Sequence, residues 1–346
     1  MNIRVAILGP TGYTGLHLIQ LLSNHPHAQI TYLASQRDEL PDITDEFPQL
    51  LGCIEPPIAQ CQPIDAKAIA KQADLAFLAL PHRVAMNYVP QLLDAGLHVI
   101  DLSADYRLSN AAMYKQVYEQ EHTDPNNLAE SLYGLPELFR RQLAGATLIA
   151  NPGCYPTVSV LAIAPLLQRS LVKPNSIIIN AASGVTGAGK NPAPHLYFSE
   201  HNESFFPYGQ IGCHRHQPEI NQVLSTVAGK DIDVLFVPHL LPIDRGILAT
   251  IYLEPAEDDV TYDDLIEAFV DAYADEPFIR VRHTLPNVKH VAGTNFCDVA
   301  IRLTETSFGR RAIVFSAIDN MIKGASGQAI QNMHVMFELN ETAGLV

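Results

Sequence analysis

The segment from Asn151 to Thr157 contains the side chain best suited to covalent chemistry, the thiol of Cys154. An apolar run over 147–150 precedes the segment and another over 158–163 follows it, which predicts a strand, a tight turn and a helix. Pro156 favours a first helical position, because its backbone angle is preset and it lacks an amide hydrogen. Cys154 should then lie at a helix N-terminus, where free N–H groups and the helix dipole favour a thiolate that can attack a carbonyl. The alternative is a buried, inert cysteine.

A second cluster, His214-Arg215-His216, places two imidazoles and a guanidinium at consecutive positions. Histidine transfers protons near neutral pH, and arginine can bind a carboxylate or a phosphate with two hydrogen bonds. Pro218 follows closely and predicts a loop that leads into a helix. Either histidine could be the acid–base group, and a role for the adjacent Cys213 is open. A metal site would need a third ligand that the sequence does not place, so we predict no metal.

A glycine-rich turn joins the first predicted strand, 3–8, to the first predicted helix. Glycines at this junction allow a tight turn and let backbone amides approach a pyrophosphate at the helix N-terminus. The spacing is G-x-x-G-x-x-G rather than the usual G-x-G-x-x-G. We predict dinucleotide binding mainly because the turn lies between the first strand and the first helix. The predicted cofactor-binding residues of this turn are Gly9, Thr11, Gly12, Tyr13, Thr14 and Gly15.

The end of the second predicted strand, 30–34, indicates which dinucleotide binds. Ser35 and Arg37 stand where an NAD site usually has an acidic residue for the ribose 2′-hydroxyl. An arginine nearby accommodates a 2′-phosphate, so we predict NADP(H) as the cofactor and both residues as its ligands. Asp38 and Glu39 adjoin Arg37, and a surface arginine without a ligand is the alternative.

Two further segments follow predicted strands. The loop 183–190 is glycine-rich but lacks the Ser or Thr that a nucleotide-triphosphate-binding loop requires after its lysine. We predict that it lines the cofactor or substrate pocket through Ser183, Gly184 and Gly187. The segment 101–108 follows a strand at the edge where doubly wound sheets bind ligands, which makes Arg107 a candidate phosphate ligand. An ion pair of Arg107 with Asp105 or Glu119 is the alternative.

These motifs need a scaffold, and the apolar runs predict two domains in the 346 residues. Strands alternate with helices over the first 150 residues, which is typical of an α/β doubly wound parallel sheet of the Rossmann type. Beyond Cys154 the runs are longer and few helices separate them, which predicts an α+β domain with a mixed or antiparallel sheet. The predicted strands there are 176–181, 233–237, 246–253 and 298–303, with a helical stretch over 319–339.

Composition narrows the function classes. Apolar residues make up 47% and charged residues 17%, which indicates a globular chain. The formal charge of −15, with no basic run, argues against a nucleic-acid partner. Five scattered cysteines do not suggest a disulfide framework, and no apolar run approaches the roughly 20 residues of a membrane span. We therefore expect a soluble protein of a reducing cytoplasm.

The motifs together resemble those of the semialdehyde dehydrogenase superfamily, most closely the N-acetyl-gamma-glutamyl-phosphate reductase family of arginine biosynthesis. The matching segments run almost end to end in family order. They are 9–15, 101–108, 133–137, 151–157, 182–190, 214–220, 238–247 and 323–332. The segments 151–157 and 214–220 separate this branch from aspartate-semialdehyde dehydrogenase.

The resemblance implies NADPH-dependent reduction of an acyl phosphate to an aldehyde, with Cys154 as nucleophile and one histidine of the 214–216 cluster as its acid–base partner. It implies that a C-terminal helix returns to the first domain near the cofactor, which adds Asn320 to the predicted cofactor contacts. The predicted domains are thus 1–150 completed by 319–346 for NADP binding, and 151–318 for catalysis and oligomerisation, as a homodimer or homotetramer. The predicted substrate-binding residues are Arg107, Asn151, Arg215 and Glu219.

Two other functions remain open at this point. One is reduction of a related acyl phosphate, aspartyl or aminoadipyl phosphate. The other is a regulator that binds NADP without catalysis, in which Cys154 is only structural.

Overall fold

The computed structural model describes residues 2–209, 212, 214–307 and 309–346, so Cys213 lies outside the described residues. The chain forms two compact units. The first unit comprises Met1–Pro152 and Ala325–Val346, and the second comprises Gly153–Gly324. The sequence placed these divisions slightly earlier in the chain, after residues 150 and 318. Among the described residues, no helix combines the length and the apolar character needed to cross a membrane.

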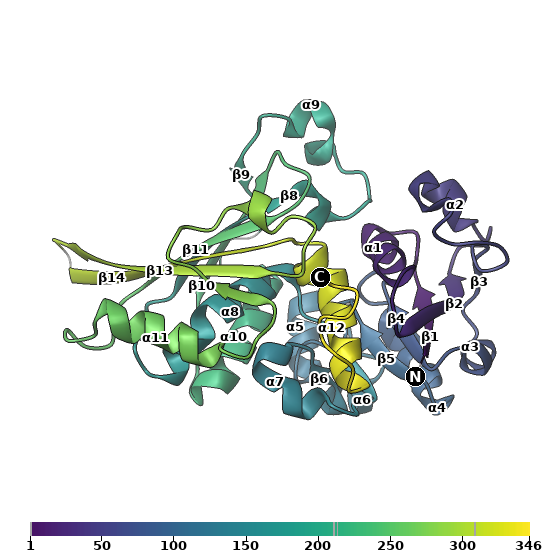
Figure 1. The fold of residues 1–346 in the computed structure, drawn as a ribbon, viewed down its shortest axis with the longest axis horizontal. Helices are drawn as coiled ribbons and strands as arrows, with labels where there is room; N and C mark the ends of the chain where they lie inside the picture. The colour runs from purple at the N-terminus through teal and green to yellow at the C-terminus, as the bar shows by residue number, and fades with distance from the viewer. Residues whose placement is uncertain (1, 210–211, 213, 308) are drawn as a thin grey trace. The chain divides into compact units, whose positions relative to one another are not determined.

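The first unit is built around a seven-stranded sheet with the order β3-β2-β1-β4-β5-β7-β6 (Figure 1). All of its strand pairs are parallel, which confirms the predicted doubly wound fold. The order reverses between β1 and β4, the place where such sheets bind ligands. The strands are β1 (Ile3–Leu8), β2 (Ala28–Ser35), β3 (Gln62–Pro63), β4 (Leu75–Leu78), β5 (His98–Asp101), β6 (Leu132–Tyr133) and β7 (Leu148–Ala150). The two-residue edge strands β3 and β6 were not predicted.

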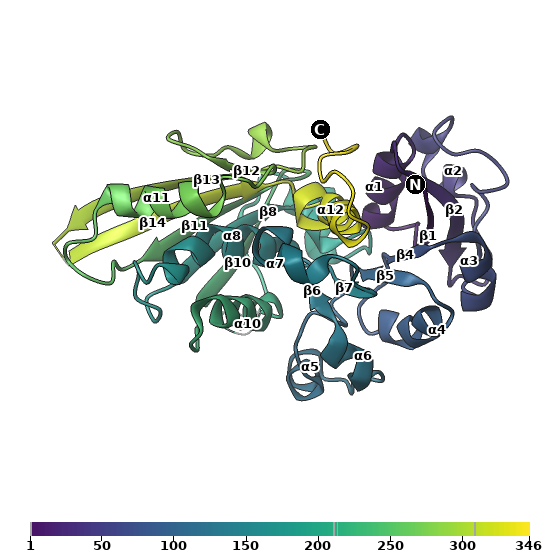
Figure 2. The ribbon, with the colours of Figure 1, turned by 60° about the horizontal axis from the view of Figure 1, so that its bottom comes forward.

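Helices cover both faces of this sheet, and Figure 2 shows α1 and α4 on opposite sides of the strands. Alternating strand residues such as Ala6, Leu8 and Leu78 pack with residues of α3 and α4 in one buried cluster. The helices of the unit are α1 (Tyr13–Leu22), α2 (Ile43–Glu46), α3 (Ala66–Gln72), α4 (Val89–Asp94), α5 (Ala111–Tyr118), α6 (Pro125–Glu130), α7 (Pro136–Leu143) and α12 (Gly327–Met336). The last of these helices comes from the C-terminal end of the chain.

The second unit contains a seven-stranded mixed sheet with the order β12-β13-β14-β11-β8-β10-β9, which confirms the predicted sheet type. Two strand pairs, β8–β10 and β12–β13, are parallel, and the others are antiparallel. The strands are β8 (Ile178–Gly184), β9 (Phe206–Pro207), β10 (Leu235–Leu241), β11 (Ile247–Leu253), β12 (Ile279–Val281), β13 (Cys297–Thr306) and β14 (Gly309–Ile318). β14 was not predicted, although it is as long as β13 and pairs with both β13 and β11.

The helices α8 (Cys154–Gln168), α10 (His216–Ala228) and α11 (Tyr262–Ala272) pack along one face of this sheet (Figure 1). The short helix α9 (Phe198–His201) lies apart from them, and a π-helix spans Ile322–Ser326. α8 is the central helix, because every residue from Tyr155 to Leu167 is buried. A helix that is apolar on all sides is stable only inside a core. The surrounding core therefore holds α8 in place.

The other face of the mixed sheet carries an exposed apolar row. Leu235 of β10 and Tyr252 of β11 each pair in register with Ile178 of the strand between them. The three side chains keep 45%, 37% and 40% of their surface exposed, in that order. Side chains alternate between the faces of a strand, so the row lies opposite the residues that contact the helices.

Two buried histidines tie the C-terminal residues to the first unit. Nε2 of His25 lies 2.8 Å from Nε2 of His334 and 3.0 Å from the carbonyl oxygen of Ala343. Nδ1 of His334 lies 2.9 Å from the carbonyl oxygen of Glu341. A carbonyl can only accept, so we infer a hydrogen on Nε2 of His25 and on Nδ1 of His334. The neutral pair satisfies all three contacts, and burial lowers both pKa values, that of His334 to about 4.

We expect the free energy of unfolding to fall as the pH drops from about 6.5, the ordinary histidine pKa, towards about 4. The unfolded chain binds more protons than the folded chain in this window, so acid favours unfolding, and the stabilisation is complete above the window. Thermal unfolding at pH 7 and pH 5 should show a smaller acid-induced loss for His334→Gln than for the unmodified chain, by on the order of 1 kcal/mol. An identical loss in both proteins would contradict a role for this pair.

Candidate active site

Cys154 is the first residue of α8, as the sequence predicted, and Gly153 precedes it as an extended N-cap without a side-chain cap. Pro156 is the third helical residue rather than the first. It still lies in the first turn, where amides have no helical acceptor, so proline is tolerated there. The Cys154 side chain is partly exposed, whereas Cys61 and Cys297 are buried. The thiol is therefore accessible at a position where the helix dipole stabilises negative charge.

Glu219 fixes the turn that leads into Cys154. Its Oε1 accepts a hydrogen bond from the backbone N–H of Gly153 at 2.9 Å, and the residue is only 1% exposed. Glu219 lies in the first turn of α10, so this bond joins the beginnings of α8 and α10. The sequence suggested that Glu219 binds substrate. In the structure it has a positioning contact with the nucleophile turn.

His214 and His216 lie close together at the start of α10. Their ring centroids are 5.1 Å apart, and the N–H of His216 donates to Nδ1 of His214 at 3.2 Å. This bond leaves the hydrogen of a neutral His214 on Nε2. Burial, helped by the charge of Arg215, lowers the pKa of His214 to about 4. His214 is therefore neutral near pH 7, with one nitrogen already committed to the backbone.

Three aromatic residues that the sequence analysis did not single out surround this cluster. The hydroxyl of Tyr208 donates to that of Tyr155 at 3.2 Å, and Tyr155 donates to the carbonyl oxygen of His239 at 3.0 Å. The rings of Tyr208 and Phe236 lie 5.7 and 5.4 Å from the ring of His214. Burial above all, together with negative charge on Cys154, raises the pKa of Tyr208 to about 12. The hydroxyl therefore stays protonated beside the nucleophile. In the sequence, Tyr208 is marked only by its place in a Tyr-Gly pair shortly before the two histidines.

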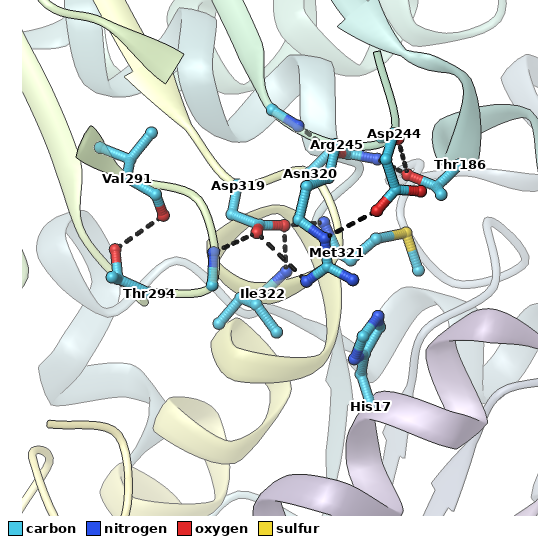
Figure 3. A network of polar contacts seen from close by, with 12 residues as sticks. His17, Thr186, Asp244, Arg245, Val291, Thr294, Asp319, Asn320, Met321 and Ile322 are labelled. Atoms are coloured by element: carbon cyan, nitrogen blue, oxygen red, sulfur yellow. Dashed lines mark hydrogen bonds and ion pairs between the residues drawn. The ribbon is translucent and has the colours of Figure 1, made fainter. Parts of the chain in front are cut away.

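Asn320, a predicted cofactor ligand, uses its side chain inside the second unit. Its Oδ1 accepts from the N–H of Gly246 at 2.7 Å, and its Nδ2 donates to Oγ1 of Thr186 at 3.0 Å (Figure 3). These bonds tie the end of β14 to the start of β11 and to the glycine-rich loop. The amide thus has a structural task, and its contact with a cofactor remains a prediction.

The glycine-rich loop itself is tightly packed where β8 ends. A Cβ on Gly184 would lie 2.7 Å from the carbonyl oxygen of Asp244, and one on Gly187 would lie 3.0 Å from Oγ of Ser183. Ser183 is buried, and its hydroxyl donates to the carbonyl oxygen of Gly184 at 3.0 Å. The small residues therefore give the loop its shape.

The glycine turn of the first unit fits a dinucleotide. Gly9 has a φ of +82°, and a Cβ there would lie 2.5 Å from the carbonyl oxygen of Ala79. A Cβ on Gly15 would lie 2.6 Å from Cα of Pro10, so the turn folds tightly on itself. No described atom outside the adjacent residues comes within 4 Å of where a Cβ of Gly12 would stand, and α1 has no side-chain cap. A helix N-terminus without a side-chain cap leaves its first N–H groups for a ligand, and a pyrophosphate is a suitable acceptor for them. Thr11, Tyr13 and Thr14 are partly exposed around this space.

The expected 2′-phosphate position follows β2. Arg37 is exposed there and forms an ion pair with Glu46, while its backbone N–H donates to Oγ of Ser35 at 3.2 Å. A guanidinium at the end of the second strand fits NADP better than NAD.

Arg107 is anchored inside the first unit. Its Nε donates to the carbonyl oxygen of Asn151 and its Nη2 to that of Leu102, both at 2.8 Å. Asn151 is itself buried, since its Oδ1 accepts from Asn332 at 2.9 Å and its Nδ2 donates to the carbonyl oxygen of Ala325 at 3.1 Å. The side chain of Asn151 is thus used to hold the C-terminal segment, and substrate binding by Arg107 and Asn151 remains a prediction.

The described residues contain no group of three or more His, Cys, Asp or Glu side chains that could hold a metal ion.

Known proteins that are similar to this chain match nearly its whole length. Residues 4–146 match the family model "Semialdehyde dehydrogenase, NAD binding domain", and residues 154–320 match "Semialdehyde dehydrogenase, dimerisation domain". The chain is 47% identical over 345 residues to the N-acetyl-gamma-glutamyl-phosphate reductase of Citrifermentans bemidjiense, covering 99% of this chain and 98% of the relative. It is 43% identical over 349 residues to the protein of the same name from Rhodopirellula baltica, covering 100% and 99%.

Solved structures share the fold. Aspartate semialdehyde dehydrogenase II of Vibrio cholerae, complexed with ASA, superposes with a TM-score of 0.71 at 16% identity, covering 97% of this chain and 98% of that one. An NADP complex of aspartate semialdehyde dehydrogenase from Candida albicans gives a TM-score of 0.70, also at 16% identity and the same coverage. At this level of identity the likeness speaks for the fold alone.

The hydrogen bond from Gly153 to Glu219 should help to position Cys154, and this can be tested by substitution. We expect Glu219→Ala to lower the free energy of unfolding by about 1–3 kcal/mol, because a buried N–H loses its acceptor. Alkylation of Cys154 by iodoacetamide at pH 7, followed by mass spectrometry of its peptide, should become slower as the helix start loosens. Glu219→Gln keeps an oxygen acceptor and should retain most of both properties.

The exposed Glu267 on α11 offers a matched control, and Glu267→Ala should change neither property. Unchanged alkylation in Glu219→Ala would show that the bond does not position Cys154.

Proposed function

Because the chain belongs to the N-acetyl-gamma-glutamyl-phosphate reductase family of semialdehyde dehydrogenases, we propose that it reduces N-acetyl-gamma-glutamyl phosphate to N-acetyl-L-glutamate 5-semialdehyde and phosphate. This is an oxidoreductase reaction of arginine biosynthesis. One structural observation supports the chemistry above all others. The partly exposed Cys154 begins a buried helix, and the ring of the next residue, Tyr155, lies 6.1 Å from the ring of His214 and 5.8 Å from that of His216 at the start of a second helix.

The first step is covalent. The thiolate of Cys154 attacks the acyl carbon, a C–S bond forms, and the bond from carbon to the phosphate oxygen breaks as phosphate leaves with the electron pair. Donors for the transient oxyanion should come from the first turn of α8, because the N–H of Gly153 is already bonded to Glu219. A thioester accepts hydride better than an ester, which is why a cysteine suits this position.

The enzyme uses NADP(H), which supplies the hydride that reduces the thioester when the cofactor is bound. The residues proposed to hold it in the first unit are Gly9, Thr11, Gly12, Tyr13, Thr14, Gly15, Ser35 and Arg37. Those proposed in the second unit are Ser183, Gly184, Gly187 and Asn320. The open space at Gly12 and the guanidinium of Arg37 support the proposal in the first unit.

The proton transfer of the last step is assigned to His216. The oxyanion left by reduction of the thioester re-forms a carbonyl, the C–S bond breaks with its electron pair going to sulfur, and His216 supplies a proton to the leaving thiolate of Cys154. His214 is kept neutral by burial and by Arg215, and its Nδ1 accepts from the backbone of His216. We propose that His214 orients His216 in this way. Arg215 is exposed next to them, and with Arg107 it is proposed to bind the phosphate group.

The second unit matches a family model for a dimerisation domain, and the protein forms homo-oligomers. We propose a homodimer or a homotetramer in which the exposed row Leu235, Ile178 and Tyr252 packs against a second copy. Apolar side chains in register over three strands suit a self-complementary contact. We place the enzyme in the cytoplasm, where the thiol of Cys154 stays reduced.

We expect the purified protein to reduce NADP with N-acetylglutamate semialdehyde only when inorganic phosphate is present, because phosphate must cleave the thioester in the reverse direction. NAD should serve less well, and aspartate semialdehyde should not replace the substrate. Cys154→Ser should lower turnover more than about a hundredfold. Turnover with aspartate semialdehyde alone would reassign the substrate, and silence with every aldehyde would favour an NADP-binding regulator.

The oligomer proposal has its own test. Replacing Leu235 and Tyr252 together with Asp should shift the molecular mass, measured by light scattering, to that of a monomer, because charges cannot be buried unpaired. Val270 on α11 is 50% exposed and lies on the helix side of the sheet, so Val270→Asp is the control and should leave the mass unchanged. An unchanged mass for the double variant would exclude this row as the interface.

A further inference from the structure

A short segment at the end of the second unit lies close beside Cys154. If Gly324 carried a Cβ, that atom would lie 2.7 Å from Cβ of Cys154 and 3.2 Å from its Cα. Real Cβ atoms do not approach a neighbour to 2.7 Å, so the backbone of Gly324 occupies space that a side chain would need. The φ of Gly324 is not in the left-handed region. The requirement for glycine is therefore one of space beside the nucleophile.

The backbone reaches this position through a π-type turn. The N–H of Gly324 donates to the carbonyl oxygen of Asp319 at 2.9 Å, five residues back, and the π-helix Ile322–Ser326 continues from there. An α-helical turn would pair residues four apart and would place Gly324 at a different angle. π-turns are rare and often mark functional sites. Here the wider turn brings the backbone of Gly324 against Cys154.

Asp319 anchors the beginning of this turn. Its Oδ1 accepts from the N–H groups of Met321 and Ile322 at 2.7 and 3.1 Å, and its Oδ2 accepts from Gly293 at 2.6 Å. Arg245 contributes an ion pair at 3.5 Å, and Asp319 is fully buried. Figure 3 shows these contacts converging on its carboxylate. A carboxylate satisfied by three backbone amides and a guanidinium has little freedom to move.

Two residues between Asp319 and Gly324 also anchor the turn. Asn320 bonds to Gly246 and Thr186, as described above. Lys323 is fully buried, with its ammonium 5.7 Å from the centre of the Phe278 ring. A buried lysine needs compensating contacts, and a cation over an aromatic face is one of them. The segment 319–324 is therefore a rigid element.

We propose that Gly324 is a positioning residue for Cys154, and that the segment 319–324 acts as a brace that holds the nucleophile at its reactive angle. The brace lies so close to Cys154 that the space beside its Cα and Cβ has no room for a side chain on Gly324, while the bond from Glu219 to Gly153 holds the preceding residue. Together they restrict the cysteine on two sides. This inference depends on the proposed role of Cys154 as nucleophile, but its structural tests do not require turnover.

Gly324→Ala should lower kcat about tenfold or more, with KM for substrate and for NADP within about twofold, because misplacement of a reacting atom by 1 Å can cost a hundredfold in rate. Alkylation of Cys154 by iodoacetamide at pH 7 should slow in parallel. Ala312→Val is the matched control. It adds bulk to a buried site near the opposite end of β14 and should lower the melting temperature without changing either rate.

A second variant separates the brace from general destabilisation. Cys154→Gly removes the Cβ with which the added methyl collides, so the fall in melting temperature caused by Gly324→Ala should largely disappear in that background. This comparison holds even if Gly324→Ala alone does not fold, because the double variant should then fold. An equal fall in both backgrounds, or an unchanged kcat in Gly324→Ala, would overturn the proposal. A wild-type protein without reductase activity would instead refute the proposed function and leave the stability comparison valid.

Discussion

The burial of α8 is the constraint on which the rest of the candidate site depends. The helix is surrounded by core from Tyr155 to Leu167, so it can neither slide nor rotate without exposing apolar side chains or leaving cavities. Its first residue is therefore placed by the packing of thirteen buried residues behind it. Cys154 is partly exposed because it lies at the N-terminal end of this helix, where the helix leaves the core. Nucleophile placement is thus a property of the whole second unit.

Contacts around the start of α8 further restrict the position of Cys154. Glu219 holds the residue before the cysteine, Gly324 presses on its side, and the Tyr155 hydroxyl bonds to His239. These groups come from segments far apart in the sequence, and each is fixed by its own buried contacts. Sites built in this way keep their geometry without a ligand. Gly184 and Asn320 also hold segments near the site in place, Gly184 by close packing and Asn320 by its hydrogen bond with Gly246.

Features that depend on neighbours in the sequence were predictable, and features that depend on distant pairing were not. The helix start at Cys154 follows from an apolar run, a proline and a second apolar run, all local signals. The parallel sheet follows from short buried runs alternating with helices. By contrast, the contact of Gly324 with Cys154 joins residues 170 positions apart, and the sequence shows only a glycine in a helical stretch. Tyr208 was missed for the same reason, because its partner Tyr155 lies on another element. The sequence predicts ligand-binding roles for the amides of Asn151 and Asn320, but it does not show the internal hydrogen bonds that both side chains also form, because their partners lie far away in the chain.

The division of the chain has a consequence for the order of folding during synthesis. The second unit is one continuous segment, Gly153–Gly324, and all of its strands can pair once that segment has left the ribosome. The first unit is different, because α12 follows the entire second unit in the chain and yet donates from Asn332 to Gly134 and Asn151. The nascent first unit must therefore wait with this surface uncovered while the second unit is made. The dinucleotide-binding half, although translated first, is the last to be completed.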